Sequence, residues 1–186
     1  MSRMNEALRI GQTQRGVLTG QTGMGKSTLA NVLVFDKPYL FVLDVKRNFE
    51  LSREYSIART PDELNEISAS QRGKGRAAIM YRPEPEFATY EELDLIYKWL
   101  YTRGNTFVYI DEMTATVGRS SLSYPPSLRS LVTQGRGLGI GMLMATQRPS
   151  NLPMWVFSES QKFWKFFLLL RKDQKRMAEW MGDGVL

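Results

Sequence analysis

The chain contains no cysteine and no histidine among its 186 residues. Without cysteine, it can form neither a disulfide nor a thiolate metal site. Without histidine, it lacks the side chain that titrates near neutral pH and serves as a common general base and metal ligand. Catalysis by this chain must therefore use carboxylates, lysine, arginine, hydroxyl groups or a bound metal ion.

Long apolar segments are also missing. The longest apolar stretch, Phe163 to Leu170, is interrupted by Lys165, and it is far shorter than the roughly 20 residues of a membrane-spanning helix. The amino terminus does not have the pattern of a secretory signal. We therefore expect no transmembrane segment and a single domain over residues 1–186, which is enough chain for one substantial core.

The charge balance is basic. Lys and Arg number 25 against 19 Asp and Glu, giving a formal charge of +6 and an isoelectric point near 9.6. A basic surface suits a polyanionic partner such as nucleic acid. Ordinary solubility charge explains the same surplus, so both interpretations stay open from charge alone.

Short apolar runs alternate with helix-like segments, which predicts an α/β fold with a mainly parallel central sheet and helices on both faces. The apolar runs are continuous, as in strands buried on both sides. Helices are expected at 28–34 and 127–134, and after the capping boxes that begin at Thr60 and Thr89. Loops are expected at 70–76 and 114–124. The expected strands are Gly16–Thr19, Tyr39–Leu43, Ala77–Tyr81, Thr106–Ile110, Ile140–Thr146 and Phe163–Leu170.

Residues 20–27 have the sequence G-Q-T-G-M-G-K-S, which matches the phosphate-binding loop G-x-x-x-x-G-K-[ST]. The glycines let successive backbone N–H groups point at phosphate oxygens, and the following helix adds the positive end of its dipole. Lys26 is expected to reach the β- and γ-phosphates of ATP, and the Ser27 hydroxyl to bind Mg²⁺. The predicted nucleotide-binding residues are Gly20, Gln21, Thr22, Gly23, Met24, Gly25, Lys26, Ser27 and Thr28.

Two acids end the expected strand at 106–110. The carboxyl ends of parallel strands face the crevice where ligands bind in α/β proteins. Asp111 is therefore placed to hold Mg²⁺ opposite Ser27, and Glu112 to activate the attacking water. A water-activating acid favours hydrolysis over phosphoryl transfer to a small molecule, which argues against a small-molecule kinase.

The segment from Gly135 to Pro149 surrounds another expected strand. Gln147 closes that strand and is predicted to hydrogen-bond the γ-phosphate or the attacking water. Arg136 stands among glycines before the strand, where it can reach a neighbouring subunit's nucleotide and stabilise transition-state charge. Arg148 is the rival candidate for that role.

Four segments together resemble the FtsK/HerA superfamily of DNA-pumping ATPases: the phosphate loop, V-L-D-V-K at 42–46, Y-I-D-E at 109–112, and A-T-Q-R-P-S at 145–150 with Arg136 before it. This resemblance covers nearly the whole chain. It implies a RecA-like P-loop fold, a homo-oligomeric ring (a hexamer), and ATP-driven, sequence-independent translocation of double-stranded DNA. A bare motor domain of this size is similar to the genome-packaging ATPases of tailless, membrane-containing icosahedral viruses. That likeness implies action in the host cytoplasm or at the packaging vertex of the virion, beside capsid or viral-membrane vertex proteins.

Other functions remain open at this point. A conjugative or plasmid DNA pump and a filamentous-phage assembly ATPase are alternatives within the motor class. A non-motor P-loop switch is the alternative outside it, although the chain has neither an Asn-Lys-x-Asp motif nor an early loop lysine of the partition type.

Several further residues have two interpretations each. Asp44 either supports the metal site or caps a turn. The basic residues either contact DNA phosphates in a pore or form ordinary surface charge. They are Lys46, Arg47, Arg72, Lys74, Arg76 and Arg119.

Overall fold

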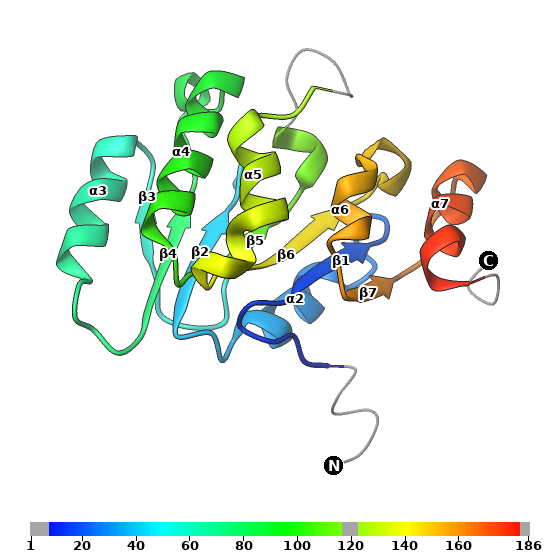
Figure 1. The fold of residues 1–186 in the computed structure, drawn as a ribbon, viewed down its shortest axis with the longest axis horizontal. Helices are drawn as coiled ribbons and strands as arrows, with labels where there is room; N and C mark the ends of the chain where they lie inside the picture. Colours follow the sequence, from blue (N-terminus) through cyan, green and yellow to red (C-terminus); the bar gives the residue numbers. More distant parts are fainter. Residues whose placement is uncertain (1–7, 117–122, 183–186) are drawn as a thin grey trace.

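The computed structural model describes residues 8–116 and 123–182. Within these ranges, seven parallel strands form one sheet in the order β3-β4-β2-β5-β6-β1-β7 (Figure 1). The strands are β1 (Arg15–Thr19), β2 (Tyr39–Leu43), β3 (Ser56–Ala58), β4 (Ala77–Tyr81), β5 (Phe107–Ile110), β6 (Gly141–Thr146) and β7 (Lys162–Lys165). The predicted α/β fold with a mainly parallel sheet is confirmed.

Six α-helices connect these strands in the described ranges. They are α2 (Lys26–Val34), α3 (Pro61–Ser70), α4 (Tyr90–Arg103), α5 (Pro126–Gln134), α6 (Met154–Ser158) and α7 (Arg171–Met181). Four short 3₁₀ turns are η1 (Pro85–Phe87), η2 (Met113–Thr116), η3 (Gly135–Leu138) and η4 (Pro149–Asn151). In the part of the chain that is described, none of the helices has the length and apolar character needed to cross a bilayer.

Helices cover both faces of the sheet, but unequally. On one face, strand residues such as Phe41 and Val108 pack in a core with apolar residues of α3, α4, α5 and α6 (Figure 1). On the other face, Val42 and Tyr109 pack with residues of α2 and with Phe49 from the loop after β2. Since alternate residues of one strand enter different cores, the central strands are apolar on both sides, as their continuous runs predict.

The structure confirms the threonine caps that were predicted to start two helices. The Thr60 hydroxyl accepts a hydrogen bond from the Glu63 backbone N–H, and Thr89 accepts one from Glu92, each at 3.2 Å. Helix α4 ends at Gly104, whose φ of 63° is strained for a residue with a side chain. These local signals fix the ends of α3 and α4, which lie on the same face of the sheet.

The last strand is shorter than predicted. Strand β7 ends at Lys165, so the expected strand from 163 to 170 is wrong for its second half. The reason is its position at the sheet edge, where β7 pairs with β1 alone and β1 ends at Thr19. The backbone beyond β7 instead follows the phosphate loop, with the Phe167 carbonyl accepting from the Gln21 N–H at 3.1 Å.

The short elements β3 and α6 were not expected from the sequence. Strand β3 has three residues and lies at the opposite sheet edge, and α6 has five residues. Both are too short to show a periodic apolar pattern. The loop expected at 70–76 is present between α3 and β4, whereas residues 117–122 of the loop expected at 114–124, including Arg119, lie outside the described residues.

Candidate nucleotide-binding site

A cavity of about 420 Å³ opens at the edge of the sheet where the strands end. Four separate segments meet there: the loop after β1 with the start of α2, and the residues that follow β2, β5 and β6. Because the sheet is parallel, all these carboxyl ends point the same way, which is where α/β folds bind ligands. The lining residues are Thr22, Gly23, Gly25, Lys26, Ser27, Thr28, Lys46, Asn48, Asp111, Glu112 and Gln147.

Backbone conformation and close packing explain why two positions of the loop after β1 are glycine. Gly25 has a φ of 92° and immediately precedes α2, which is a left-handed position that favours glycine. Gly20 lies so close to Phe166 that an added Cβ would stand 2.6 Å from the Phe166 Cβ atom. The loop is therefore packed against the segment after β7, and its shape depends on contacts far along the chain.

Lys26 begins helix α2 and turns back over the loop. Its Nζ atom donates hydrogen bonds to the carbonyl oxygens of Gly20 at 2.6 Å and Gln21 at 2.9 Å. Burial lowers the pKa of Lys26, while the nearby charges of Glu112 and Asp111 oppose that shift. A half-buried ammonium held at the start of a helix is suited to binding phosphate oxygens.

Asp111 follows β5 and lines the same cavity as Ser27. The Tyr109 hydroxyl donates to its Oδ1 atom at 2.7 Å. Burial raises the pKa of Asp111 and the Tyr109 hydrogen bond lowers it, while the charges of Asp44 and Glu112 add to the rise. The neighbouring acidic charges disfavour the ionised form of Asp111, and a bound cation would stabilise it.

The donor set fits magnesium. The Ser27 hydroxyl and the Asp111 carboxylate offer oxygen atoms, which Mg²⁺ prefers. Among the described residues, no group of three or more acidic side chains gathers into a metal cage. Mg²⁺ usually keeps several waters and takes one or two protein oxygens together with substrate phosphates. The arrangement therefore suits an ion that is bound together with a nucleotide.

Glu112 is the most constrained side chain of the site. Its side chain is 4% exposed, and its Oε1 atom accepts from the Thr114 hydroxyl at 2.7 Å. The backbone N–H of Gln147 lies 3.3 Å from Oε2 and 3.4 Å from Oε1. The ends of β5 and β6 are thus joined through one carboxylate.

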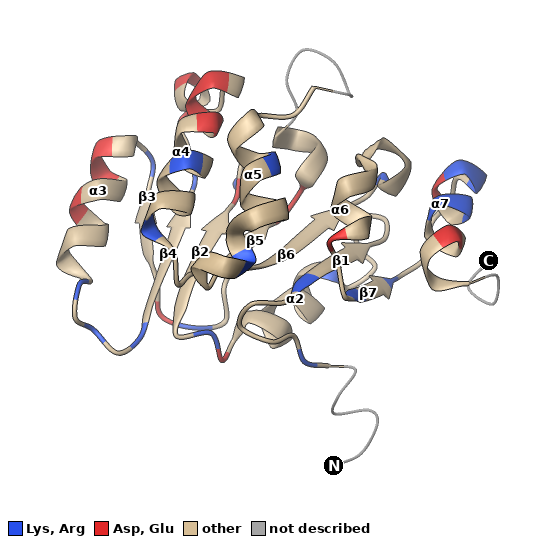
Figure 2. Ribbon diagram, in the orientation of Figure 1, with Lys and Arg blue, Asp and Glu red and all other residues tan. Residues whose placement is uncertain are grey.

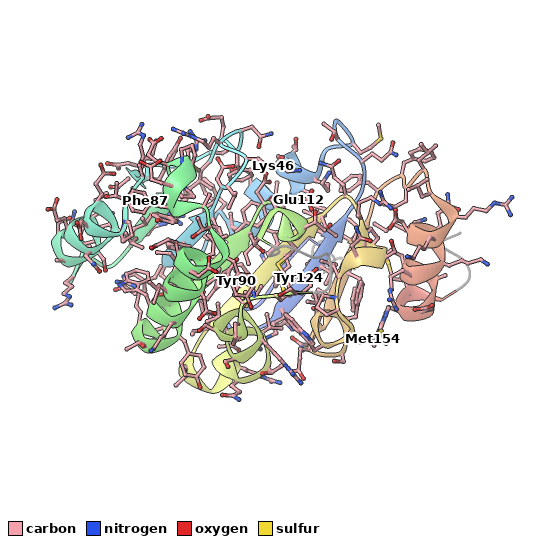
Figure 3. The ribbon with its side chains drawn as sticks, turned by 90° about the horizontal axis from the view of Figure 1, so that it is seen from above. Lys46, Phe87, Tyr90, Glu112, Tyr124 and Met154 are labelled. Carbon is pink, nitrogen blue, oxygen red and sulfur yellow. The ribbon has the colours of Figure 1, made fainter. Side chains whose placement is uncertain are left out.

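Lys46 also binds this carboxylate. Its Nζ atom lies 3.2 Å from Oε2 of Glu112, and its side chain is 38% exposed. Figure 3 shows the two residues close together in the upper half of the view. The sequence predicts that Lys46 is either a DNA contact or ordinary surface charge. The structure places it in the nucleotide cavity, because β2 and β5 are neighbours in the sheet.

The two candidate trans-acting arginines differ in position. Arg148 follows Gln147, and its Nε atom donates at 3.0 Å to Asp173, a buried carboxylate of α7. Arg136 lies in η3 before β6, is exposed, and does not line the cavity of its own subunit. The predicted site residues other than Arg136 thus gather at the edge where the strands end, whereas Arg136 lies at the edge where they begin.

Two other residues with open interpretations take structural positions. Asp44 accepts hydrogen bonds from the backbone N–H groups of Asn48 at 3.2 Å and Phe49 at 3.1 Å, and from Arg82 Nε at 2.7 Å. Its role as a turn cap is therefore the one that the structure shows. Arg47 pairs with Glu84 at 3.0 Å.

The sequence is similar to the DNA packaging ATPase P9 of Enterobacteria phage PRD1, with 28% identity over 165 residues, 87% of this chain and 67% of P9. No protein-family profile matches the chain.

Solved structures share the fold. The genome packaging NTPase B204 from Sulfolobus turreted icosahedral virus 2, in complex with AMPPCP, superposes with a TM-score of 0.68 and 20% identity, covering 94% of this chain and 85% of B204. VirB4 of Thermoanaerobacter pseudethanolicus gives a TM-score of 0.58 with 9% identity, covering 92% of this chain and 84% of VirB4. The similarity to P9 confirms the expected likeness to genome-packaging ATPases, and the shared fold with B204 confirms the expected P-loop NTPase fold.

Proposed function

We propose that this chain is an ATPase that hydrolyses ATP to move double-stranded DNA, and that it packages a viral genome. The observation that carries the proposal is the cavity in which the loop after β1, the Asp111 carboxylate, the buried acid Glu112 and Gln147 meet. The sequence similarity to P9 and the shared fold with B204 support packaging as the task. Its place of action is then the host cytoplasm or the packaging vertex of a virion.

ATP binding begins at the loop between β1 and α2. Phosphate oxygens would take over the hydrogen bonds that Lys26 Nζ makes to the loop carbonyls, and the N–H groups at the start of α2 would face the β-phosphate. Ser27 and Asp111 would hold Mg²⁺, which neutralises charge on the phosphates when it is bound. Loop and helix would thereby hold the phosphates in the cavity that Glu112 lines.

Hydrolysis would use Glu112 as the base. The attacking water gives a proton to the carboxylate, its oxygen bonds to the γ-phosphorus, and the bond from that phosphorus to the β–γ bridging oxygen breaks to leave ADP and phosphate. Gln147 would orient the water from the end of β6. Its N–H contact with Glu112 couples the base to the position of that strand.

Lys46 would move during this reaction. Its ion pair lies on Oε2, the carboxylate oxygen that does not accept from the Thr114 hydroxyl, and release of Oε2 by Lys46 would raise the basicity of Glu112 when the water is activated. A partly exposed lysine on the cavity wall has the freedom to do so, and the γ-phosphate offers its ammonium a stronger partner. Thr114 keeps Glu112 in place through the exchange.

A ring would complete the motor. A head-to-tail ring places one subunit's surface against the next subunit's nucleotide. Arg136 is exposed and far from its own cavity, as a residue that acts on a neighbour must be. We extend the proposal to a hexamer on the strength of the family resemblance, with capsid or viral-membrane proteins at the vertex as docking partners.

The proposal is tested by ATP turnover with and without double-stranded DNA, together with the mass of the oligomer in solution. The wild-type protein should hydrolyse ATP, and DNA should accelerate it. Lys26→Ala should abolish turnover and weaken nucleotide binding, because it removes the cation from the β- and γ-phosphates. Unchanged turnover in Lys26→Ala would contradict the nucleotide site, and turnover indifferent to DNA would contradict the motor.

A further inference from the structure

The strands begin at the side of the sheet opposite the nucleotide cavity. This side carries two hollows of about 470 and 500 Å³, and Gln71 lines both of them. Five cationic side chains line them: Arg53, Lys74 and Arg76 in the first, and Arg72 and Arg103 in the second. We call these five residues the basic edge. Glu54, in the first hollow, is the one acid in either lining.

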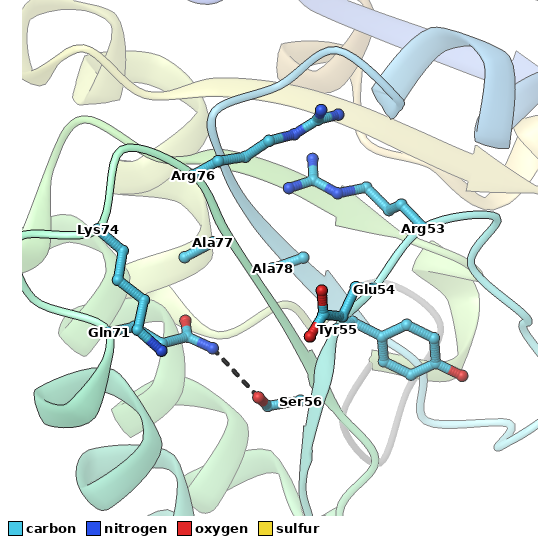
Figure 4. A pocket seen from close by; sticks show the side chains of 9 residues that line it. All are labelled: Arg53, Glu54, Tyr55, Ser56, Gln71, Lys74, Arg76, Ala77 and Ala78. Atoms are coloured by element: carbon cyan, nitrogen blue, oxygen red, sulfur yellow. Dashed lines mark hydrogen bonds between the residues drawn. The ribbon is translucent and has the colours of Figure 1, made fainter.

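The basic edge is drawn from segments that are distant in sequence. Arg53 precedes β3, Arg76 precedes β4 and Arg103 precedes β5, while Arg72 and Lys74 lie in the loop between α3 and β4. In Figure 4, Arg53 and Arg76 extend toward each other across the first hollow, with Lys74 on the side of Gln71. The Gln71 amide donates to Ser56 at 3.2 Å and fixes the wall between the hollows.

Carboxylates within the described residues do not neutralise the basic edge. None of its five members forms an ion pair there, although eight ion pairs are present elsewhere in that part of the molecule. Burial lowers the pKa of Arg53, and the nearby charge of Arg76 lowers it further. Burial and the charge of Arg72 act on the pKa of Arg103 in the same way. These cations repel one another and would be stabilised by an external anion.

Part of the edge has a structural task. Arg53 donates to the Lys37 carbonyl at 2.6 Å and the Phe35 carbonyl at 3.4 Å, and Arg76 also binds the Phe35 carbonyl, beyond the end of α2. Arg103 donates to Ser68 and stacks on Trp99. The side chains of Arg72 and Lys74 make no hydrogen bond or ion pair within the described residues. These two are therefore the members most available to a ligand.

We propose that the basic edge binds the phosphodiester backbone of DNA, as a contact surface separate from the nucleotide cavity. The inference rests on the proposed function, because that function supplies the DNA. Guanidinium and ammonium groups from several segments suit a chain of phosphates, and contacts of this kind do not depend on base sequence. A lipid surface fits less well, since the cations line hollows and a flat bilayer would meet only their rims.

The decisive experiment compares two charge-reversed proteins with the wild type. The double variant Arg72→Glu/Lys74→Glu removes two members of the edge. The matched control Lys172→Glu/Lys175→Glu makes the same change in net charge on two exposed lysines of α7. Affinity for double-stranded DNA is measured over a range of salt concentrations, alongside ATP turnover without DNA.

We expect the edge variant to bind all DNA sequences more weakly, with a salt dependence of log K that is shallower by about 2, or about 1 for each lost phosphate contact. The control should keep the wild-type slope, and both variants should keep DNA-free ATP turnover. Equal weakening in both variants would reduce the effect to net charge and overturn the inference. So would a wild-type slope in the edge variant.

Failure of the proposed function looks different. In that case, the wild-type protein itself shows no DNA binding and no DNA-stimulated turnover, whatever the variants do. To separate DNA from a small phosphate ligand, inorganic phosphate is added at constant ionic strength. If phosphate binds the wild type but not the edge variant, while both proteins bind DNA with the same affinity and salt dependence, the hollows are small-anion sites, and the inference is overturned.

Discussion

Acids balance the cations at the edge where the strands end, but cations outnumber acids at the edge where the strands begin. In the nucleotide cavity, two cations, Lys26 and Lys46, face two acids, Asp111 and Glu112, and Lys46 and Glu112 bind each other directly. At the opposite edge, five cations share two hollows with one acid. At the balanced edge, cationic and acidic side chains lie against one another. The five cations of the unbalanced edge form no ion pair within the described residues, and Figure 2 shows blue segments in the loop between α3 and β4.

Helix direction explains part of this difference. The carboxyl edge of the sheet receives the amino end of α2, whose dipole is positive and suits phosphate. The other edge receives the carboxyl ends of α2, α3 and α4, which attract cations. Arg53 serves such a helix end, since it binds carbonyls that follow α2. Arg72 and Lys74 do not, so helix ends alone do not account for the basic edge.

The largest expected effect concerns Arg136. It lies at the edge where the strands begin, and it is proposed to act at the nucleotide cavity of a neighbouring subunit. Arg136→Ala should lower turnover by about 10³–10⁵, the range for arginines that stabilise phosphoryl-transfer charge. Mixing it with Glu112→Gln, a chain inactive by itself, should restore part of the activity, because some interfaces then pair an intact phosphate site with an intact arginine. Normal activity of Arg136→Ala by itself would point instead to Arg148.

Glu112→Gln should come next, with turnover lower by about 10²–10⁴ because the general base is lost. ATP and Mg²⁺ binding should persist, since the amide keeps the shape of the side chain. Glu54→Gln is the matched control, because Glu54 is the acid of the opposite edge. Turnover and nucleotide affinity report the two effects separately. Equal losses in both variants would erase the distinction between the edges.

Lys46→Met should reduce kcat by about tenfold, with a small change in KM, because a cation that moves from Glu112 to the γ-phosphate acts mainly in the transition state. Lys46→Arg should recover part of the rate, and Lys74→Met at the other edge should be silent in DNA-free turnover. A faster Lys46→Met enzyme would show that Lys46 only restrains the base.

The smallest expected effect is on stability, and it separates cations that hold the fold together from cations that are free to bind a ligand. Arg53→Met should lower the free energy of unfolding by about 1 kcal/mol, because it removes hydrogen bonds to carbonyls beyond α2. Arg72→Met should stay within about 0.5 kcal/mol of the wild type, as surface substitutions usually do. Denaturant unfolding measures both. Equal destabilisation would mean that the whole basic edge is structural.

The sequence was sufficient for features that are made by contiguous residues. The phosphate loop, the threonine caps of α3 and α4, and the Asp111-Glu112 pair after a strand each lie within a few residues. Their geometry follows from local backbone preferences and side-chain chemistry. The continuous apolar runs also predicted the parallel sheet, because strands buried on both faces have no polar side.

Tertiary structure alone decided which distant residues meet. Lys46 and Glu112 are 66 positions apart and pair because β2 lies beside β5. Strand β7 ends early because its one neighbour turns away into the phosphate loop. The basic edge forms because parallel strands all begin on the same side, which brings together cations from three separate connections between strands. Strand order is set by the packing of the whole core, and a local pattern does not contain it.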